Sequence, residues 1–534
     1  MVGMALRLVL GLVGVGALAI LGVASAAELS GTAGPDRLLG TAGSDTIFGL
    51  QGNDHIEGRG GPDLLNGGPG RDVVLGNGGS DRIAVHADRA RDSVACGAGF
   101  DIVNAELTDV VAADCEIVSR QVSRDALRMF RGQHETQVEP DSLAVGSTVV
   151  TAFQSGRFVD GGAAGIGWAT STDAGRTWRS GFLERTTDRA SDPVVAYDAA
   201  RRTWLIATLG ASESSGALLV SRSPDGLSWS RPEPAAADPA ERYDKEWLTC
   251  DSWPRSLHRG RCYLSYLDGE TDEIRTRFST DGGVTWSRPV GVRTAGRSQP
   301  NGAFPIVRPD GMLVVVFRTI GVLADERDAV VVSRSTDGAV SFTPVEVITE
   351  RFEEHIFSVR APVLVTADVD AAGTVYVAWG DCRASADCTS NDIVLTTSRD
   401  GVTWTAPLRV PFPADPEVSW FVPGISVASG TAGTRARLAL AAYAVTTRYG
   451  CQFCDTVDAW AITSNDGGRS WAAARRINAE PMELLWLADT GAGRMLADYV
   501  STSFAAGVPI AVMSIAADPA MGEFRQSIFA TRLP

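Results

Sequence analysis

The chain from about residue 135 to its C-terminus alternates short apolar runs with turn residues. Residues 148–153 read Thr-Val-Val-Thr-Ala-Phe, and residues 373–379 read Gly-Thr-Val-Tyr-Val-Ala-Trp. Short runs rich in β-branched and aromatic residues, bounded by glycine and polar turn residues, are typical of strands. This pattern predicts an all-β region with about four strands in each repeating unit.

Six segments between these runs share the pattern S-x-D-(x)-G-x-[T/S]-W. They begin at Ser171, Ser223, Ser279, Ser335, Ser398 and Ser464, and their aspartates are 52, 56, 56, 63 and 66 residues apart. Recurrence at such a period indicates stacked or radially arranged units. Four-stranded units arranged around a ring form a β-propeller.

This pattern is the Asp box, and residues 135–534 resemble the sialidase-like BNR-repeat propellers. Serine and aspartate side chains can bond turn amides, glycine allows positive φ, and tryptophan packs into the sheet. In that family the boxes lie on the outer rim, so the resemblance implies a fold more than an activity. The fourth box departs from the pattern, with Ala339 at the glycine position and Phe342 in place of tryptophan.

The number of blades is left open by the boxes alone. Six boxes mark six blades, but 63 residues follow Trp471. Residues 496–504, 509–516 and 526–533 read as strands within that tail. We therefore expect a seventh blade without a box, closed by a strand from the N-terminal side, with six blades as the alternative.

A second repeat precedes the propeller. Aspartates recur every nine residues, each with glycine two positions before it and an aliphatic residue two positions after it: Asp36, Asp45, Asp54, Asp63, Asp72 and Asp81. This nonapeptide resembles the haemolysin-type (RTX) calcium-binding repeats, which implies a parallel β-roll with calcium held by these six aspartates. If two repeats form one coil, residues 18 apart stack on the same edge.

Non-glycine residues occupy the second position of several of these turns. Thr41, Leu50 and Arg59 stand where the family usually has glycine, so we expect weaker calcium binding there. A metal-free linker rich in glycine and aspartate is the alternative reading. We place the roll at residues 27–119 with a disulfide-closed cap, a linker at 120–134 and the propeller at 135–534.

The N-terminus and the cysteines predict export. Arg7, the apolar run 8–23 and Ala24-Ser25-Ala26 form the pattern of a secretory signal over residues 1–26, with a membrane anchor as the alternative. No further stretch has the length and apolarity to span a bilayer. The chain has eight cysteines, which we expect to form local disulfides: Cys96 with Cys115, Cys250 with Cys262, Cys382 with Cys388 and Cys451 with Cys454. Pairing of Cys382 and Cys388 with Cys451 and Cys454, across blades, stays open as the alternative.

The net charge of −16 argues against nucleic-acid binding and against docking on anionic membranes, and it is compatible with cation binding. The sequence therefore predicts a secreted, extracellular protein with calcium as its cofactor.

Polar residues beside prolines recur where the innermost strands of the blades should start. They are Glu139-Pro140, Asp192-Pro193, Gln299-Pro300 and Arg360-Ala361-Pro362, with residues 243–247 at the equivalent place in the third repeat and Asp498-Tyr499 in the last. The geometry of a ring would bring these side chains together at one mouth of the channel. Lys245 is the only lysine among 48 basic residues, so that site is predicted either to need a compact ammonium or to use it as a structural bridge.

The sialidase resemblance implies an arginine triad, a Tyr–Glu nucleophile pair and an aspartate acid. The candidates for the triad are Arg157, Arg360 and Arg383; Tyr499 with Glu246 would form the pair, and Asp160 or Asp192 would be the acid. The Arg-Ile-Pro motif of that family is absent. The predicted catalytic residues are Asp192, Glu246, Arg360 and Tyr499, and the predicted ligand-binding residues are Glu139, Arg157, Asp244, Lys245, Arg383 and Asp498.

These patterns predict a secreted calcium-binding protein whose propeller binds or hydrolyses extracellular glycans or glycoproteins, with an exo-sialidase as the enzymatic form. A non-catalytic adhesion propeller is the alternative. A third reading is another hydrolase or lyase that uses Asp244, Glu246 and Asp251. Three converging arginines that face a tyrosine would favour the sialidase; carboxylates around one lysine would favour binding or other chemistry.

Overall fold

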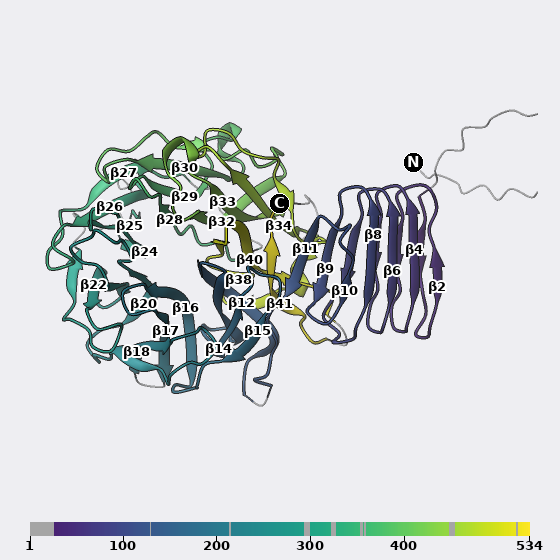
Figure 1. Ribbon diagram of the computed structural model, residues 1–534, viewed down its shortest axis with the longest axis horizontal. Helices are drawn as coiled ribbons and strands as arrows, with labels where there is room; N and C mark the ends of the chain where they lie inside the picture. The colour runs from purple at the N-terminus through teal and green to yellow at the C-terminus, as the bar shows by residue number, and fades with distance from the viewer. Residues whose placement is uncertain are drawn as a thin grey trace, which may run out of the picture.

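The computed structural model describes residues 26–534 except 129, 213–214, 293–298, 322–326, 353–355, 357–358, 448–453 and 520–521. The expected signal peptide, apart from Ala26, therefore lies outside the described residues, as does Cys451. Figure 1 shows a ring of antiparallel sheets with a narrower stack of parallel strands attached to one side. No helix in the described part of the chain is long and apolar enough to cross a membrane.

The N-terminal stack is a roll of two parallel sheets. One contains β2 (Arg37–Leu39), β4 (His55–Gly60), β6 (Val73–Gly78), β8 (Ser93–Ala98) and β10 (Val110–Val111). The other contains β1 (Glu28–Ser30), β3 (Thr46–Phe48), β5 (Leu64–Asn66), β7 (Arg82–Val85), β9 (Ile102–Glu106) and β11 (Ile117–Gln121). Leu38 pairs with Ile56 and Ile56 with Val74, so residues 18 apart stack and two repeats make one coil. One aliphatic residue per repeat fills the interior, and Ile47, Ile56, Leu65, Val74 and Ile83 are fully buried.

The ring consists of antiparallel meanders. The first three sheets are β12 (Gln133–Val145), β13 (Thr148–Arg157), β14 (Ala163–Ser171) and β15 (Arg179–Phe182); β16 (Arg189–Asp198), β17 (Thr203–Ser212), β18 (Ser215–Ser223) and β19 (Glu233–Ala236); and β20 (Tyr243–Cys250), β21 (Cys262–Asp268), β22 (Glu273–Ser279) and β23 (Val290–Val292).

The next three sheets are β24 (Gln299–Val307), β25 (Leu313–Ile320), β26 (Ala329–Ser335) and β27 (Glu346–Glu350); β28 (Thr366–Val369), β29 (Val375–Asp381), β30 (Asp392–Ser398) and β31 (Leu408–Arg409); and β32 (Val418–Val427), β33 (Leu438–Thr446), β34 (Thr456–Ser464) and β35 (Arg475–Arg476), with β36 (Met482–Glu483) also on β34. Short elements lie in the connections. η1 (Ala386–Cys388) falls between β29 and β30, and η2 (Gly433–Arg435) between β32 and β33. η3 (Leu484–Trp486) and the pair β37 (Ala488–Thr490) and β38 (Gly493–Met495) precede the last sheet.

The last sheet closes the ring with strands from both ends of the chain. β39 (Ser501–Ala505), β40 (Val508–Ala516) and β41 (Gln526–Arg532) form a meander. β11 of the roll pairs antiparallel with β41 and parallel with β9, so one sheet runs from the roll into the ring. The first strands of neighbouring sheets contact one another around the ring, and β39 contacts both β32 and β12.

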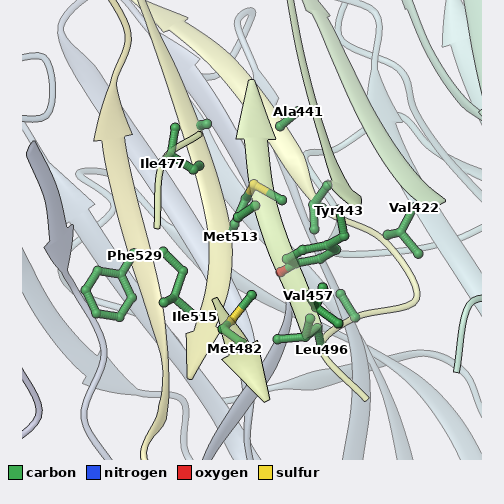
Figure 2. Packing of buried hydrophobic residues seen from close by; sticks show 14 of the residues in the cluster. Val422, Ala441, Tyr443, Val457, Ile477, Met482, Leu496, Met513, Ile515 and Phe529 are labelled. Atoms are coloured by element: carbon green, nitrogen blue, oxygen red, sulfur yellow. The ribbon is translucent and has the colours of Figure 1, made fainter. Parts of the chain in front are cut away.

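A large apolar core lies where the closing sheet meets β33 and β34. Figure 2 shows Tyr443, Met513 and Phe529 within it, and Ile102 and Ile117 of the roll belong to the same cluster. The Tyr443 hydroxyl donates to the Ser514 carbonyl at 2.9 Å, which satisfies the polar tip of this buried ring. The apolar surface of the roll is thus continuous with that of the ring.

The segment expected as a linker is packed against the closing sheet. Val122, Ser123 and Leu127 are buried. The Val122 amide donates to the Ile528 carbonyl at 2.8 Å, and the Ser123 hydroxyl accepts from the Ile528 amide at 2.7 Å. These contacts arise because β11 continues into the ring.

The six Ser-Asp segments form tight turns after the third strand of each sheet. In the third, Asp281 Oδ1 accepts the amides of Val284 and Thr285 at 3.0 and 2.9 Å, and its Oδ2 accepts the Thr285 hydroxyl at 2.6 Å. Partial burial opposes ionisation, but these hydrogen bonds outweigh it and lower the pKa of Asp281 to about 2. In the fourth turn Gly338 and Ala339 both adopt positive φ, of 76° and 67°, so alanine is accommodated there.

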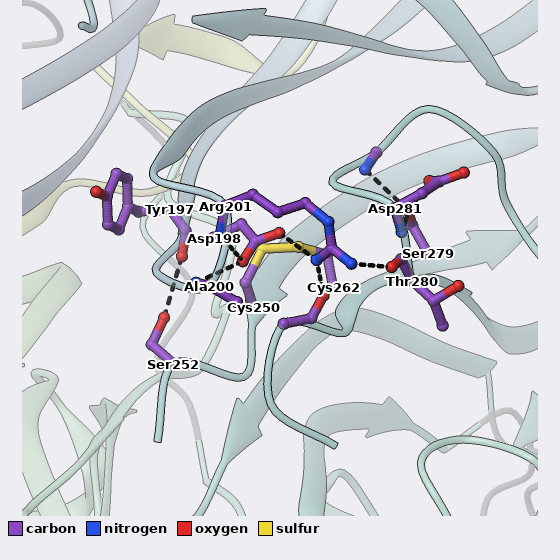
Figure 3. Close-up of a disulfide and its surroundings, with 12 residues drawn as sticks. Tyr197, Asp198, Ala200, Arg201, Cys250, Ser252, Cys262, Ser279, Thr280 and Asp281 are labelled. Carbon is purple, nitrogen blue, oxygen red and sulfur yellow. Dashed lines mark hydrogen bonds and ion pairs between the residues drawn. A yellow bond between two sulfur atoms is a disulfide. The ribbon is translucent and has the colours of Figure 1, made fainter. Parts of the chain in front are cut away.

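Three of the expected local disulfides are present: Cys96–Cys115, Cys250–Cys262 and Cys382–Cys388. Cys454 is also disulfide-bonded. Figure 3 shows Cys250–Cys262 beside Arg201, whose guanidinium bonds Asp198 at 2.7 Å and the Gly260 carbonyl at 2.8 Å. Cys250 and Cys262 are register partners on β20 and β21, so this bridge joins the first two strands of the third sheet.

Candidate functional site

A left-handed bulge interrupts the first strand of several sheets at the same place. Glu139, Asp192 and Lys245 have φ of 53°, 48° and 49°, and Gly302 and Val422 have φ of 67° and 50°. The strand register shifts at each of these positions. Because a bulge turns a side chain out of the regular alternation, it can point the bulged residue toward the centre of the ring.

These bulges bring three acids and a lysine together. Lys245 Nζ lies 2.6 Å from Asp498 Oδ2, 3.4 Å from Asp192 Oδ1 and 3.8 Å from Glu139 Oε1. All four side chains are at least largely buried. Burial opposes the charge of Lys245, but the carboxylates outweigh it and raise its pKa well above the usual value. We call Glu139, Asp192, Lys245, Arg360 and Asp498 the funnel cluster.

Arg360 completes the cluster from the segment before β28. Its Nε and Nη2 donate to the two oxygens of Asp498 at 2.7 and 2.5 Å. Burial raises the pKa of Asp498, but Lys245 and Arg360 together hold it below the usual range. Asp498 is therefore an ionised carboxylate fixed by two cations.

Glu246 lies next to the cluster and differs from its neighbours. Its side chain is buried, and neither carboxylate oxygen has a hydrogen-bond partner in the described structure. Burial, and then the charge of Asp192, raises the pKa of Glu246 well above the usual value. A buried carboxyl group in this environment is held in its protonated, neutral form.

Aromatic side chains form the other wall of this site. The Trp247 ring lies 4.4 Å from that of Phe304 and 5.2 Å from that of Tyr499, measured between centroids. The Tyr499 hydroxyl donates to the Pro193 carbonyl at 3.2 Å. These rings, Glu246 and Lys245 line a cavity of about 20 Å³, which has room for about one water molecule.

The structure thus brings together most of the predicted funnel residues. Asp244 is half-buried beside Lys245, and burial raises its pKa. Arg157 donates to the Gly162 carbonyl at 2.7 Å and lies 3.5 Å from Gln154, which itself bonds Glu139. Arg157 is therefore linked to Glu139 of the cluster through Gln154.

Other candidates are engaged elsewhere. Arg383 pairs with Asp381 at 2.6 Å and bonds the Glu350 carbonyl, and Asp160 pairs with Arg189 near the surface at 2.6 Å. Asp251 accepts from the Trp253 amide and the Ser256 hydroxyl within its own loop. The three candidate arginines are thus bound to different partners.

Sequence reasoning missed two members of the bulge series. Gly302, not the Gln299-Pro300 pair, occupies the equivalent position in β24, and Val422 occupies it in β32. The available signals were Asn301-Gly302, a pair typical of positive φ, and a second residue-proline pair at Val422-Pro423. Neither side chain carries charge, which explains why the cluster is confined to the other sheets.

The turns of the roll offer oxygen atoms to a cation. Asp54 Oδ1 accepts the Asp36 amide at 2.8 Å, whereas Asp54 Oδ2 is buried without a hydrogen-bond partner in the described structure. A Cβ added at Gly76 would lie 2.5 Å from both Asp81 Oδ2 and the Cys96 carbonyl, so backbone and carboxylate oxygens converge there. Burial raises the pKa of Asp63 and of Asp72 to about 7.

This arrangement fits calcium, which takes six to eight oxygen ligands, many of them carbonyls. No group of three or more acidic, histidine or cysteine side chains that could hold a metal occurs among the described residues. A cation in the roll would therefore be held by single aspartates together with backbone oxygens.

Comparison with known families identifies the roll. The RTX calcium-binding nonapeptide repeat (4 copies) matches residues 30–65 and 57–88. The chain therefore carries RTX repeats, and repeats of this family bind calcium. No curated protein matches the chain.

Several solved structures are similar to this chain. The Hadza microbial sialidase Hz136 is 18% identical, with a TM-score of 0.41 over 61% of this chain and 66% of that one. The Penicillium chrysogenum α-L-arabinanase complexed with arabinobiose is 15% identical, with a TM-score of 0.42 over 60% and 92%. A PL25 ulvan lyase bound to an oligosaccharide is 10% identical, with a TM-score of 0.45 over 74% and 94%. Similarity at this level transfers no activity to the present chain.

Proposed function

We propose that this is an exported protein whose propeller binds and hydrolyses an extracellular glycan at the funnel cluster. The observation that carries the proposal is Glu246, a buried carboxyl group without a hydrogen-bond partner among the described residues, beside the ion-paired Asp192. A group that served only to hold the strands together would be expected to have partners.

The chemistry requires two carboxyl groups in different protonation states. Glycoside hydrolysis uses one as a proton donor and another as base or nucleophile. The surroundings of Glu246 favour its neutral form, whereas the Oδ1 atom of Asp192 is ion-paired with the Lys245 ammonium at 3.4 Å. Glu246 would protonate the leaving oxygen, and Asp192 would activate water or attack the sugar.

The exo-sialidase form has less support than hydrolysis of another sugar. A triad for a substrate carboxylate needs three free guanidinium groups at one point. Arg360 is bound to Asp498, Arg383 to Asp381, and Arg157 to the Gly162 carbonyl. The funnel cluster presents more carboxylates than cations, which favours a neutral sugar over an anionic one.

The test is a panel of fluorogenic glycosides, sialosides included, with the full-length protein and two variants. We expect turnover on a neutral glycoside that falls at least about 100-fold in Glu246→Gln, the typical contribution of general acid catalysis. Asp281→Asn, in an exposed turn of the third sheet, is the matched control and should retain activity. Equal turnover in wild type and Glu246→Gln would overturn the assignment.

A non-catalytic interaction propeller is the second candidate, because the funnel cavity is small. A larger cavity, of about 340 Å³, lies where the roll meets the closing sheet. Arg89, Arg124, Arg128 and Arg525 line it. If no glycoside is turned over and glycan binding is lost in Arg124→Gln/Arg525→Gln but not in Glu246→Gln, the protein is a binding module that uses this cavity.

The remaining architecture belongs to the same proposal. We infer seven blades, the last built from β39, β40, β41 and β11, and Asp boxes of the BNR type in the other six. Residues 1–26 would be the export signal, 27–119 the roll and 135–534 the propeller. Calcium, held by the RTX turns, would stabilise the roll after export, because a roll this thin buries little apolar surface by itself.

A further inference from the structure

The aspartates of the roll fall into two groups that the repeat pattern does not separate. In the two N-terminal turns, the amide of a threonine four residues before the aspartate donates to Oδ2 of that aspartate. The Thr32 amide and hydroxyl donate to Asp36 Oδ2 at 2.5 and 2.9 Å. The Thr41 amide donates to Asp45 Oδ2 at 2.5 Å, and its hydroxyl donates to Asp45 Oδ1 at 2.9 Å.

The later turns leave one carboxylate oxygen unpaired. Oδ2 is buried without a hydrogen-bond partner in Asp54, Asp63, Asp72, Asp81, Asp92 and Asp101. Asp92 and Asp101 lie beyond residues 30–88, after a step from Asp81 to Asp92 that breaks the nine-residue spacing, yet only 1% of Asp92 and 0% of Asp101 is exposed. They continue the same ladder, because Asp92 Oδ1 accepts the Asp72 amide at 2.7 Å and Asp101 Oδ1 accepts the Asp81 amide at 2.8 Å.

Backbone conformation accompanies the division. The residue four before the aspartate is left-handed in five of the six turns with an unpaired oxygen, at Leu50, Arg59, Gly68, Asn77 and Gly97. In the sixth turn, before Asp92, the left-handed residues are Ala87 and Arg89. Thr32 and Thr41 do not have positive φ. A β-branched residue resists the left-handed region, so the threonine turns fold differently and bring an amide and a hydroxyl onto the carboxylate.

The series of unpaired carboxylate oxygens ends at Asp109, beside Arg120. Asp109 accepts the amides of Asp92 and Glu106 through its two oxygens. Arg120 Nη1 donates to the carbonyls of Glu106 at 2.8 Å and Asp109 at 3.2 Å. The Arg120 guanidinium thus binds backbone carbonyls at the propeller end of the ladder. Neither Asp92 nor Asp101 has an ion-pair partner in the described part of the chain.

We propose that Asp92 and Asp101, outside the nonapeptides, are calcium ligands, and that Asp36 and Asp45, inside them, are not. The row of calcium sites then begins at Asp54 and ends at Asp101, displaced by about one coil toward the propeller. This inference rests on calcium binding by the roll and adds the assignment of ligands. It places the last ions against β9 and β11, the strands that join the roll to the ring.

The test is the number of calcium ions bound per chain, measured by equilibrium dialysis of the chelator-treated full-length protein with calcium alone. Asp36→Asn/Asp45→Asn should bind as many ions as wild type. Asp92→Asn/Asp101→Asn should bind about two fewer, because each substitution removes one charged oxygen ligand. Circular dichroism of each variant reports whether the roll folds.

The possible outcomes distinguish failure of this ligand assignment from failure of calcium binding by the roll. If the wild type binds no calcium, the calcium role itself is wrong. If it binds calcium and only the Asp36/Asp45 variant loses ions, the assignment is overturned. If Asp92→Asn/Asp101→Asn fails to fold, the variant Thr41→Gly provides the test. This substitution removes the threonine hydroxyl from Asp45 and should raise the number of bound calcium ions by one. An unchanged number of bound ions would contradict the inference.

Discussion

Lys245 and Asp498 form an ion pair of 2.6 Å although 253 residues separate them in the chain. Lys245 stands on a left-handed bulge of β20, and Asp498 lies in the segment just before β39 of the closing sheet, followed by Tyr499 and Val500. The pair therefore forms only when the ring is closed. Because Asp498 also binds Arg360, the ion pair links three sheets at the centre of the ring.

Removing the ammonium should destabilise the ring strongly. Lys245→Met would leave Glu139, Asp192 and Asp498 buried near one another without their shared cation. Breaking a buried pair in this way costs about 3–5 kcal/mol. The free energy of unfolding, measured by denaturant titration, should fall by about that amount relative to wild type.

The control is Arg327→Met, which removes an exposed pair with Glu350 at 2.8 Å. Exposed pairs are worth about 0–1 kcal/mol, so this variant should resemble wild type. Equal losses in the two variants would show that Lys245 does not neutralise the acids at the centre.

The sequence predicted which residues gather at the funnel better than it predicted their register. Lys245 was marked by being the only lysine, and Glu139 and Asp192 by the prolines that follow them. The same proline rule failed at Gln299, because the common feature is a left-handed residue, which glycine supplies in β24 as Gly302. Proline marks the residue that follows the bulged one, whereas positive φ identifies the bulged residue itself.

The propeller should lose stability as the pH rises, through Asp141. Its Oδ2 accepts the Val195 amide at 2.7 Å between β12 and β16, and burial raises its pKa to about 7. A raised folded-state pKa contributes stability that is complete below the unfolded value, near 4, and is lost as the pH rises through about 7. The loss approaches about 1.4 kcal/mol per pH unit between these values.

Asp141→Asn keeps an acceptor and removes the titration, so thermal unfolding should show a smaller decline between pH 5 and 8 than wild type. Asp281→Asn is the opposite case, because the pKa of Asp281 is lowered to about 2 and its contribution is lost only as the pH falls through that value. An unchanged pH slope in Asp141→Asn would contradict the assignment.

The disulfide in the third sheet should contribute more than its position at an edge suggests. Cys250 and Cys262 close a loop with a sequence separation of 12. Loops near this length give about 3 kcal/mol in the chain-entropy treatment. Cys250→Ser/Cys262→Ser should lower the free energy of unfolding by up to that amount, measured by urea titration under non-reducing conditions. Wild type in reducing buffer should match the variant more closely than it matches oxidised wild type.

The period of the roll and the stacking of residues 18 apart were predictable, because aspartate, glycine and aliphatic residues recur together. The backbone conformation of individual turns was not predictable from the sequence. Thr41, Leu50 and Arg59 all appeared as departures from glycine, yet Leu50 and Arg59 adopt φ of 68° and 76° and keep the open turn. Of these three residues only the β-branched threonine lacks positive φ. The repeat pattern records which residue types occur at the position and does not capture that steric difference.

Calcium removal should loosen the closing sheet as well as the roll. β11 pairs with β9 of the roll and with β41 of the ring, and the Ser119 hydroxyl lies 2.8 Å from that of Thr531. If calcium orders the roll, chelation weakens the strand on which β41 depends. Hydrogen exchange measured by mass spectrometry should therefore accelerate in residues 526–532 on adding chelator. Residues 329–335 of β26, across the ring, serve as the internal control and should stay protected. Loss of protection confined to residues 28–106, with residues 526–532 unchanged, would show that the roll and the ring are stabilised independently.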